Sequence, residues 1–112
     1  MDVRVDHRGD VAVVAIVGSI DATSAPQLST VLSEQIQAGK GKLVGDLTGV
    51  DYTSSAGLRA LLASLKNTRS SGGDLRLAGT QKNVHKVLEM SGFTSILKSF
   101  PDVEQAVASF GG

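Results

Sequence analysis

Two adjacent serines, Ser54 and Ser55, stand where a short polar turn leads into a strongly periodic helix. A serine at the start of a helix ordinarily caps it, because its hydroxyl accepts a hydrogen bond from an otherwise unpaired backbone N–H group. The same position also favours an added phosphate, since the first turn of a helix carries partial positive charge. On these residues alone, the pair is either a structural cap or a site of regulatory modification.

Three further polar residues are expected near this serine pair. Asp46 ends an apolar run and Thr53 directly precedes the serines, so both belong to the region between a strand and the next helix. In α/β sheets, ligands and partners usually bind at the carboxyl ends of the strands. Asp21 follows another strand and is expected at the same edge, although a loop aspartate most often forms a turn or caps a helix.

The serine turn is a poor candidate for catalysis. A nucleophile elbow requires the pattern Gly-x-Ser-x-Gly, and residues 53–57 lack the first glycine for either serine. A general base would have to be His7 or His85, one in a terminal hairpin and the other on a later helix. We therefore expect no catalytic residue and no enzyme activity.

Cofactor and metal sites are disfavoured as well. The basic, glycine-rich residues 39–42 precede a strand, whereas a phosphate-binding loop joins a strand to a following helix. The chain has 2 histidines and no cysteine, which is a poor ligand set for a transition metal. We expect neither a cofactor nor a metal.

The composition indicates one small cytoplasmic domain. The 112 residues are 41% hydrophobic and 20% charged, which argues against disorder. With 11 basic and 11 acidic residues interspersed along the chain, no basic stripe is present and nucleic-acid binding is not expected. Apolar runs are too short to span a membrane, and no signal-peptide pattern is present, so membrane insertion is not expected.

Hydrophobic periodicity predicts an α/β fold. Alternation over residues 2–6 and an apolar run over residues 11–17 predict an antiparallel hairpin, and shorter strands are expected at residues 43–47, 75–78 and 96–97. Helices between and after them predict a mixed, mostly parallel sheet of about four or five strands with about four helices. The second helix carries an apolar stripe that we expect to be core, with partner contact as the alternative: Leu58, Leu61, Leu62 and Leu65.

The order and spacing of three segments resemble the STAS domain and, within it, the bacterial anti-sigma factor antagonists. These segments are Gly-Ser-Ile-Asp at residues 18–21, Asp-Leu-Thr at residues 46–48, and Tyr-Thr-Ser-Ser-Ala-Gly-Leu-Arg at residues 52–59. The Ser-Ser-Ala-Gly-Leu-Arg block is the specific part of the match. The resemblance covers nearly the whole chain and implies a single STAS domain over residues 1–112.

The resemblance also implies a switch. Members of the family bind an anti-sigma factor that is also a serine kinase, which frees the sigma factor; the kinase phosphorylates one serine in this turn, and a serine phosphatase resets it. Alignment on Gly57 and Leu58 places that serine at Ser55, and places Ser54 where many members have aspartate. Asp21 matches a loop aspartate near the phosphosite. The residues expected to form the partner-binding site are Asp21, Asp46, Thr53, Ser54 and Gly57.

A second interpretation stays open at this point. STAS domains also occur as small accessory subunits of lipid-transport ATPases, where binding need not depend on phosphorylation. The alternative function is therefore an accessory subunit of this kind, or another interaction module that works without phosphorylation.

Overall fold

A computed structural model describes residues 1–39 and 41–111 of the protein. Lys40, part of the glycine-rich stretch considered above, and Gly112, the last residue of the expected domain, lie outside the described residues. The elements in chain order are β1 (Asp2–Arg8), β2 (Val11–Val17), α1 (Ala25–Gln37), β3 (Lys42–Gly49), α2 (Ser55–Ser70), β4 (Asp74–Ala78), α3 (Lys82–Met90), a 3₁₀ turn (Phe93–Ser95), β5 (Ser99–Phe100) and α4 (Val103–Ala108).

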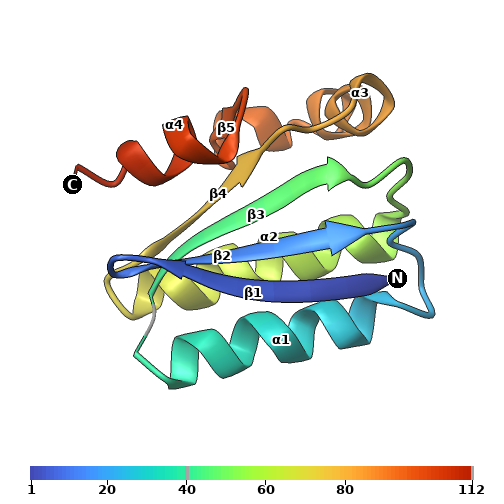
Figure 1. Cartoon of the computed structure of the whole chain (residues 1–112). Helices are drawn as coiled ribbons and strands as arrows, with labels where there is room; N and C mark the ends of the chain where they lie inside the picture. Colours follow the sequence, from blue (N-terminus) through green and yellow to red (C-terminus); the bar gives the residue numbers. More distant parts are fainter. Residues whose placement is uncertain (40, 112) are drawn as a thin grey trace.

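The sheet has the order β1-β2-β3-β4-β5, with β1 and β5 at its edges (Figure 1). The first two strands are antiparallel, and each later neighbour is parallel to the strand before it. The hairpin turn is only two residues long, and Gly9 adopts a positive φ of 61° there, which a residue with a side chain rarely tolerates. The predicted mixed sheet with its antiparallel N-terminal hairpin is confirmed.

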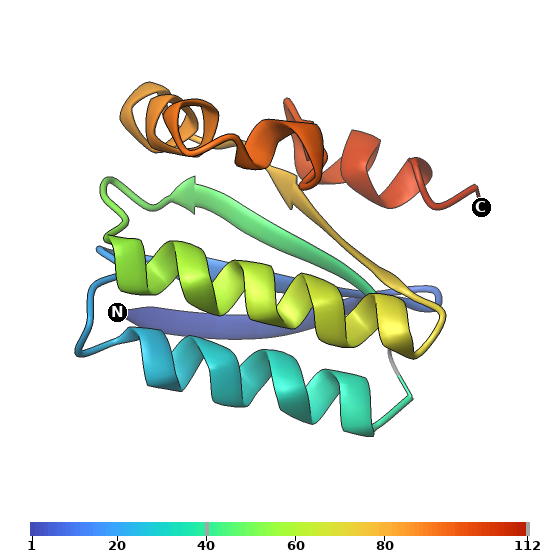
Figure 2. The same ribbon diagram turned by 180° about the vertical axis from the view of Figure 1, so that it is seen from behind.

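Helices α1 and α2 lie side by side on one face of the sheet, where they cover the main core (Figure 2). This face buries the aliphatic side chains of β2, β3 and both helices. Leu58, Leu61 and Leu65 of α2 are buried there and Leu62 is partly buried against the same cluster, so the predicted apolar stripe is core. None of the helices in residues 1–39 and 41–111 has the length and apolar character needed to cross a lipid bilayer.

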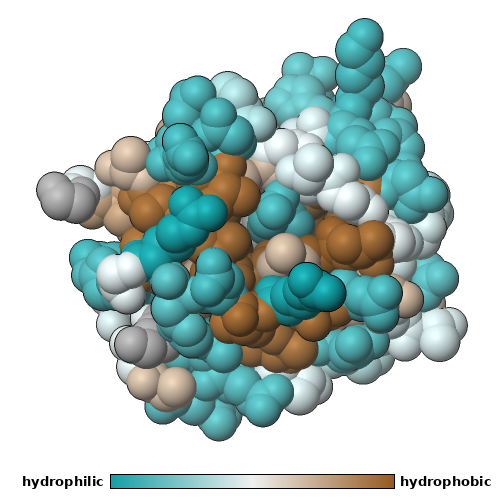
Figure 3. All heavy atoms as spheres, in the orientation of Figure 1, coloured by the Kyte–Doolittle hydropathy of each residue, from teal (hydrophilic) through white to brown (hydrophobic). Residues whose placement is uncertain are grey.

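The opposite face of the sheet is covered by α4, which packs on β3 and β4 and closes a smaller apolar cluster. Arg76 of β4 holds this helix in place, because its guanidinium donates to Ser109 Oγ at 2.8 Å and lies 4.1 Å from the ring centroid of Phe110. Asp74 pairs with the same guanidinium at 3.0 Å. Within residues 1–39 and 41–111, no helix lies over β1 and β2 on this face (Figure 1), although Val11 and Val13 of β2 are buried there, and apolar surface is visible on it in Figure 3.

The prediction of a strand at residues 96–97 is wrong. The chain there continues from the 3₁₀ turn, and the N–H groups of Ile96 and Leu97 both donate to Phe93 O, at 3.1 and 2.8 Å. Strand pairing begins only at Ser99, in the short β5 parallel to β4. Leu97 is buried in the main core from this turn, and a short apolar pair fits a buried turn as well as it fits a strand.

Candidate functional site

The serine turn and the loop that follows β2 form one unit at the carboxyl edge of the sheet. The Ile20 N–H donates to Tyr52 O at 2.9 Å, and the Ser54 N–H donates to Ile20 O at 2.8 Å. These bonds form an isolated parallel bridge between Ile20 and Thr53. The expectation that the Asp21 loop lies beside the serine turn is therefore confirmed at the level of the backbone.

Ser54 is the cap of α2. Its backbone is extended (φ −89°, ψ 174°), and its Oγ accepts a hydrogen bond from the Gly57 N–H at 3.3 Å. Its carbonyl oxygen accepts from the Leu58 N–H at 3.0 Å, which starts the helical hydrogen-bond ladder. The half-buried Ser54 side chain is thus committed to holding the helix start.

Ser55 differs from its neighbour in both exposure and bonding. It is the first residue of α2 and its side chain is exposed. Within the described part of the chain, its hydroxyl makes no hydrogen bond. The hydroxyl stands beside the first N–H groups of the helix, which have no partner inside it. Of the two serines, Ser55 is the one whose oxygen an enzyme can reach without breaking an internal bond.

Thr53 and Gly57 lie beneath the serines instead of facing outward. Thr53 is only 4% exposed, and Gly57 is also buried. A Cβ on Gly57 would stand 2.4 Å from Thr53 Oγ1 and 2.8 Å from Ile20 Cγ2. The glycine therefore lets the first turn of α2 approach the Ile20 bridge, so these two residues support the turn from inside.

Asp21 organises its own loop as an exposed turn. Its Oδ1 accepts from the backbone N–H groups of Thr23 and Ser24, at 2.9 and 3.0 Å, and from Ser24 Oγ at 3.2 Å. The hydrogen bonds from the Ser24 backbone and hydroxyl hold the pKa of Asp21 below its ordinary value of 3.8. An ionised carboxylate therefore stands on the loop that is bonded to the serine turn.

Asp46 is not brought together with the serines, and that expectation is corrected. Side chains alternate along β3, so the buried Leu47 faces α1 and α2 whereas Asp46 shares the opposite face with Val44. Asp46 Oδ1 accepts from the N–H and hydroxyl of Thr48, at 3.1 and 2.6 Å. Its carboxylate fixes the end of β3 on the α4 side of the sheet.

Asp21, Asp51, Tyr52 and Ser54 form a rim around Ser55, and of these four residues Asp51 and Tyr52 were not predicted from the sequence. Asp51 joins the two loops to α3: its Oδ1 accepts from Ser19 Oγ at 3.0 Å, and its backbone oxygen accepts from the Asn83 side-chain amide. Tyr52 is 52% exposed. A lone tyrosine in a polar turn is a signal that was available, since exposed aromatic residues are enriched where partners bind.

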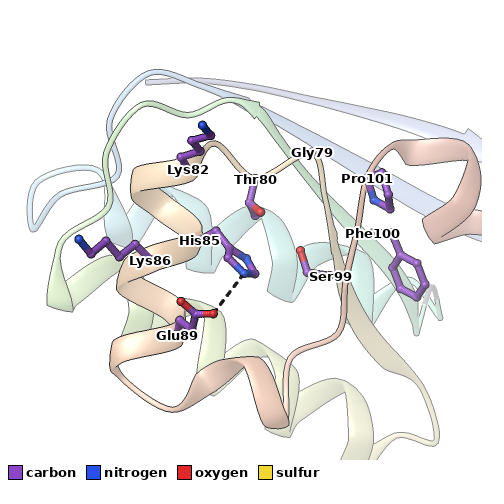
Figure 4. Close-up of a pocket in the computed structure, with 9 residues that line it drawn as sticks. All are labelled: Gly79, Thr80, Lys82, His85, Lys86, Glu89, Ser99, Phe100 and Pro101. Carbon is purple, nitrogen blue, oxygen red and sulfur yellow. Dashed lines mark ion pairs between the residues drawn. The ribbon is translucent and has the colours of Figure 1, made fainter.

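A separate hollow of about 560 Å³ lies between α3 and β5 (Figure 4). The side chains of Thr80, His85 and Ser99 point into it, whereas Lys82 and Lys86 point outward. His85 Nε2 stands 3.9 Å from Glu89 Oε2. No residue of the serine turn lines this hollow, and within residues 1–39 and 41–111 neither turn serine bonds to a histidine.

Comparison with known proteins places these features in a family context. The sequence matches the STAS domain profile over residues 2–106. It is 34% identical to a Bordetella bronchiseptica protein named anti-sigma factor antagonist BtrV, over 98% of this chain and 95% of that protein. An anti-sigma-B factor antagonist of Listeria monocytogenes is 31% identical over 74% of this chain and 73% of its own length.

Solved structures share the fold. An anti-sigma factor antagonist from Thermotoga maritima superposes with a TM-score of 0.92 at 22% identity, covering 98% of this chain and 95% of that chain. The unphosphorylated form of the anti-sigma factor antagonist SpoIIAA gives a TM-score of 0.76 at 16% identity, covering 99% of both chains. At these identities the likeness concerns the fold.

Proposed function

Because the chain belongs to the STAS domain family, and within it to the anti-sigma factor antagonists, we propose that it binds an anti-sigma factor through the exposed rim around Ser55. The proposed partner is also a serine kinase that phosphorylates Ser55 and thereby ends the complex. A serine phosphatase restores the binding form. The protein acts in this scheme as a regulatory binding module.

The contrast between the two serines is the observation that carries the proposal. Ser54 Oγ already accepts from the Gly57 N–H at 3.3 Å, so modification there would break the helix cap. Ser55 is exposed and its hydroxyl is uncommitted within the described residues. The position of Ser55 also matches the serine that is phosphorylated in the family.

Phosphate at Ser55 can switch binding without unfolding the domain. It adds about −1.5 to −2 charges at neutral pH, and it does so at a helix start, where backbone N–H groups and the helix dipole favour negative charge. In a partner interface the same charge must be desolvated and repels acidic groups. A loss of about 3 kcal/mol there lowers affinity by about two orders of magnitude.

The other residues have different parts in this proposal. Asp21 adds a second negative charge on the neighbouring loop, because its carboxylate stays ionised at neutral pH. Ser54 forms the rim and caps the helix, while Thr53 and Gly57 position the turn from beneath. Asp46 faces the other side of the sheet and is left out of the binding surface.

Mass spectrometry tests the assignment of the phosphosite. The protein is incubated with MgATP and its cognate anti-sigma factor, and the phosphate is mapped by fragmentation of the peptide that contains both serines. We expect a single phosphate on Ser55, none on the Ser55→Ala variant, and unchanged modification of Ser55 in Ser54→Ala. Phosphate on Ser54, phosphate elsewhere, or no phosphate would overturn the assignment. Co-purification with a transport ATPase subunit in place of a kinase would contradict the proposed function itself.

A further inference from the structure

Strand β1 is an exposed edge of the sheet. It pairs with β2 on one side only (Figure 1), and all its residues except the half-buried Val3 are exposed. An edge strand presents a row of unpaired N–H and C=O groups that another strand can pair with. Natural proteins blunt such an edge with a short strand, proline, a bulge or charged side chains. The seven residues of β1 have no proline, and their register with β2 is unbroken.

The charged side chains of β1 alternate in sign along one face. Asp2, Arg4, Asp6 and Arg8 stand two residues apart and therefore point to the same side, the face opposite α1 and α2. Val3 identifies that side, because it points the other way and packs against the main core. Within residues 1–39 and 41–111, none of the four charged side chains makes a hydrogen bond or an ion pair.

We propose that β1 is a homodimer interface, with β1 of a second copy of this chain as its occupant. The two strands pair antiparallel around a two-fold axis that passes through Val5. In this register Asp2 lies opposite Arg8 of the second copy, and Arg4 lies opposite Asp6 of the second copy. The symmetry makes each pair twice, so all eight charges are matched. On the face of the strands that carries α1 and α2, Val5 lies against Val5 of the second copy; in the single chain this residue is 37% exposed.

The charge pattern selects this register against its neighbours. A two-fold axis perpendicular to the sheet keeps the side chains of the same face of both strands on one side. In any other symmetric register, a different residue of β1 therefore lies on the axis in place of Val5. Centring the pairing on Arg4 places Arg4 opposite Arg4 and Asp2 opposite Asp6. Centring it on Asp6 places Asp6 opposite Asp6 and Arg4 opposite Arg8. Like charges directly opposite each other on paired strands are destabilising, whereas opposite charges stabilise the pair.

The dimer leaves the proposed switch accessible in both copies. Asp2 pairs with Val17 at the carboxyl end of β2, the end at which the serine turn lies. Because Asp2 stands opposite Arg8 of the second copy, the two-fold axis puts the two serine turns at opposite ends of the continuous sheet. The proposed dimer interface and the proposed switch at Ser55 therefore do not overlap, so an experiment can refute either proposal and leave the other standing.

Sedimentation velocity over a range of concentrations tests the proposal with charge reversals. We expect a concentration-dependent dimer for the unmodified chain. Arg4→Glu and Asp6→Arg should each raise the dimer dissociation constant by about tenfold or more, because each turns two attractive cross-strand pairs into repulsive ones. The control is Lys66→Glu, a charge reversal at an exposed position of α2, which should leave dimerisation unchanged.

Complementation separates pairing from any loss of folding. An equimolar mixture of the Arg4→Glu and Asp6→Arg chains matches every charge across the two strands, so the mixture should form a heterodimer. The double variant Arg4→Glu/Asp6→Arg should recover the homodimer for the same reason. A chain that stays monomeric at all concentrations would overturn the proposal. So would a dimer that neither reversal weakens, a dimer that Lys66→Glu weakens equally, or a mixture that shows no rescue.

Discussion

At the residue scale, replacing Ser54 or Ser55 by alanine should change the free energy of unfolding by different amounts. Ser54→Ala removes the helix cap and should lower the free energy of unfolding by about 1 kcal/mol. Ser55→Ala removes an exposed, unbonded hydroxyl and should change it by less than about 0.5 kcal/mol. Urea unfolding followed by circular dichroism measures both values. Equal losses for the two variants would show that the serines share the capping role.

Gly57 gives a second prediction at this scale. In an ordinary helix a glycine-to-alanine change is stabilising by about 1 kcal/mol. Here the new Cβ would lie 2.4 Å from Thr53 Oγ1, so we expect Gly57→Ala to lower the free energy of unfolding by about 1–3 kcal/mol. The double variant Thr53→Ala/Gly57→Ala should recover part of this loss, because it removes the clashing oxygen. Ala63→Gly, at an exposed site of the same helix, measures the propensity term alone. A Gly57→Ala variant more stable than the parent would contradict this packing.

At the element scale, the loop after β2 is hydrogen-bonded to the serine turn, and Asp21 holds that loop together. Hydrogen bonds from Ser24 lower the pKa of Asp21 below 3.8 in the folded protein. A carboxyl group whose pKa is lowered on folding stabilises the folded state at pH values above its pKa in the unfolded chain. This stabilisation is lost as the pH falls through the pKa of the folded protein. We therefore expect the loop to loosen only in acid, below a pH of about 4, and binding at neutral pH to be insensitive to this group.

A nuclear magnetic resonance titration of the Asp21 carboxyl carbon measures this effect. The midpoint should lie below 3.8, and Ser24→Ala should move it upward, because the hydroxyl bond is lost while the backbone bond remains. A midpoint at or above 3.8 in the parent chain would contradict the bonded geometry.

The elements that the sequence predicted well are those with a strong period. The hairpin follows from alternation in β1 and a continuous apolar run in β2, and the helices and the stripe of leucines in α2 follow from apolar residues that recur every three to four positions. The face of a strand end is harder to read: Asp46 was placed at the correct edge but on the wrong side of β3. The bridge between Ile20 and Thr53 joins loops that are distant in the sequence, and no local pattern encodes it.

At the scale of the whole molecule, the two proposed surfaces occupy different boundaries of the same sheet. The rim around Ser55 lies at the carboxyl ends of the parallel strands, where α/β folds usually bind their partners. The β1 edge lies at right angles to it, along the hairpin that the sequence predicted. The family resemblance of the serine motif pointed to the first surface and to Ser55, and the structure adds that Ser54 caps α2 whereas the side chain of Ser55 is exposed. The contacts of Asp51 depend on the fold and could not be predicted, whereas Tyr52 could have been singled out as a lone aromatic residue in a polar turn.

In the proposed switch, charge at Ser55 ends partner binding while the fold stays intact. Its most direct test is the affinity for the cognate anti-sigma factor, measured by isothermal titration calorimetry for Ser55→Ala and Ser55→Asp. Ser70→Asp serves as the matched control, because it adds the same charge at the far, exposed end of α2. We predict that Ser55→Ala and Ser70→Asp bind like the parent chain and that Ser55→Asp binds at least about tenfold more weakly. Equal affinities of Ser55→Ala and Ser55→Asp would show that charge at this position does not control binding.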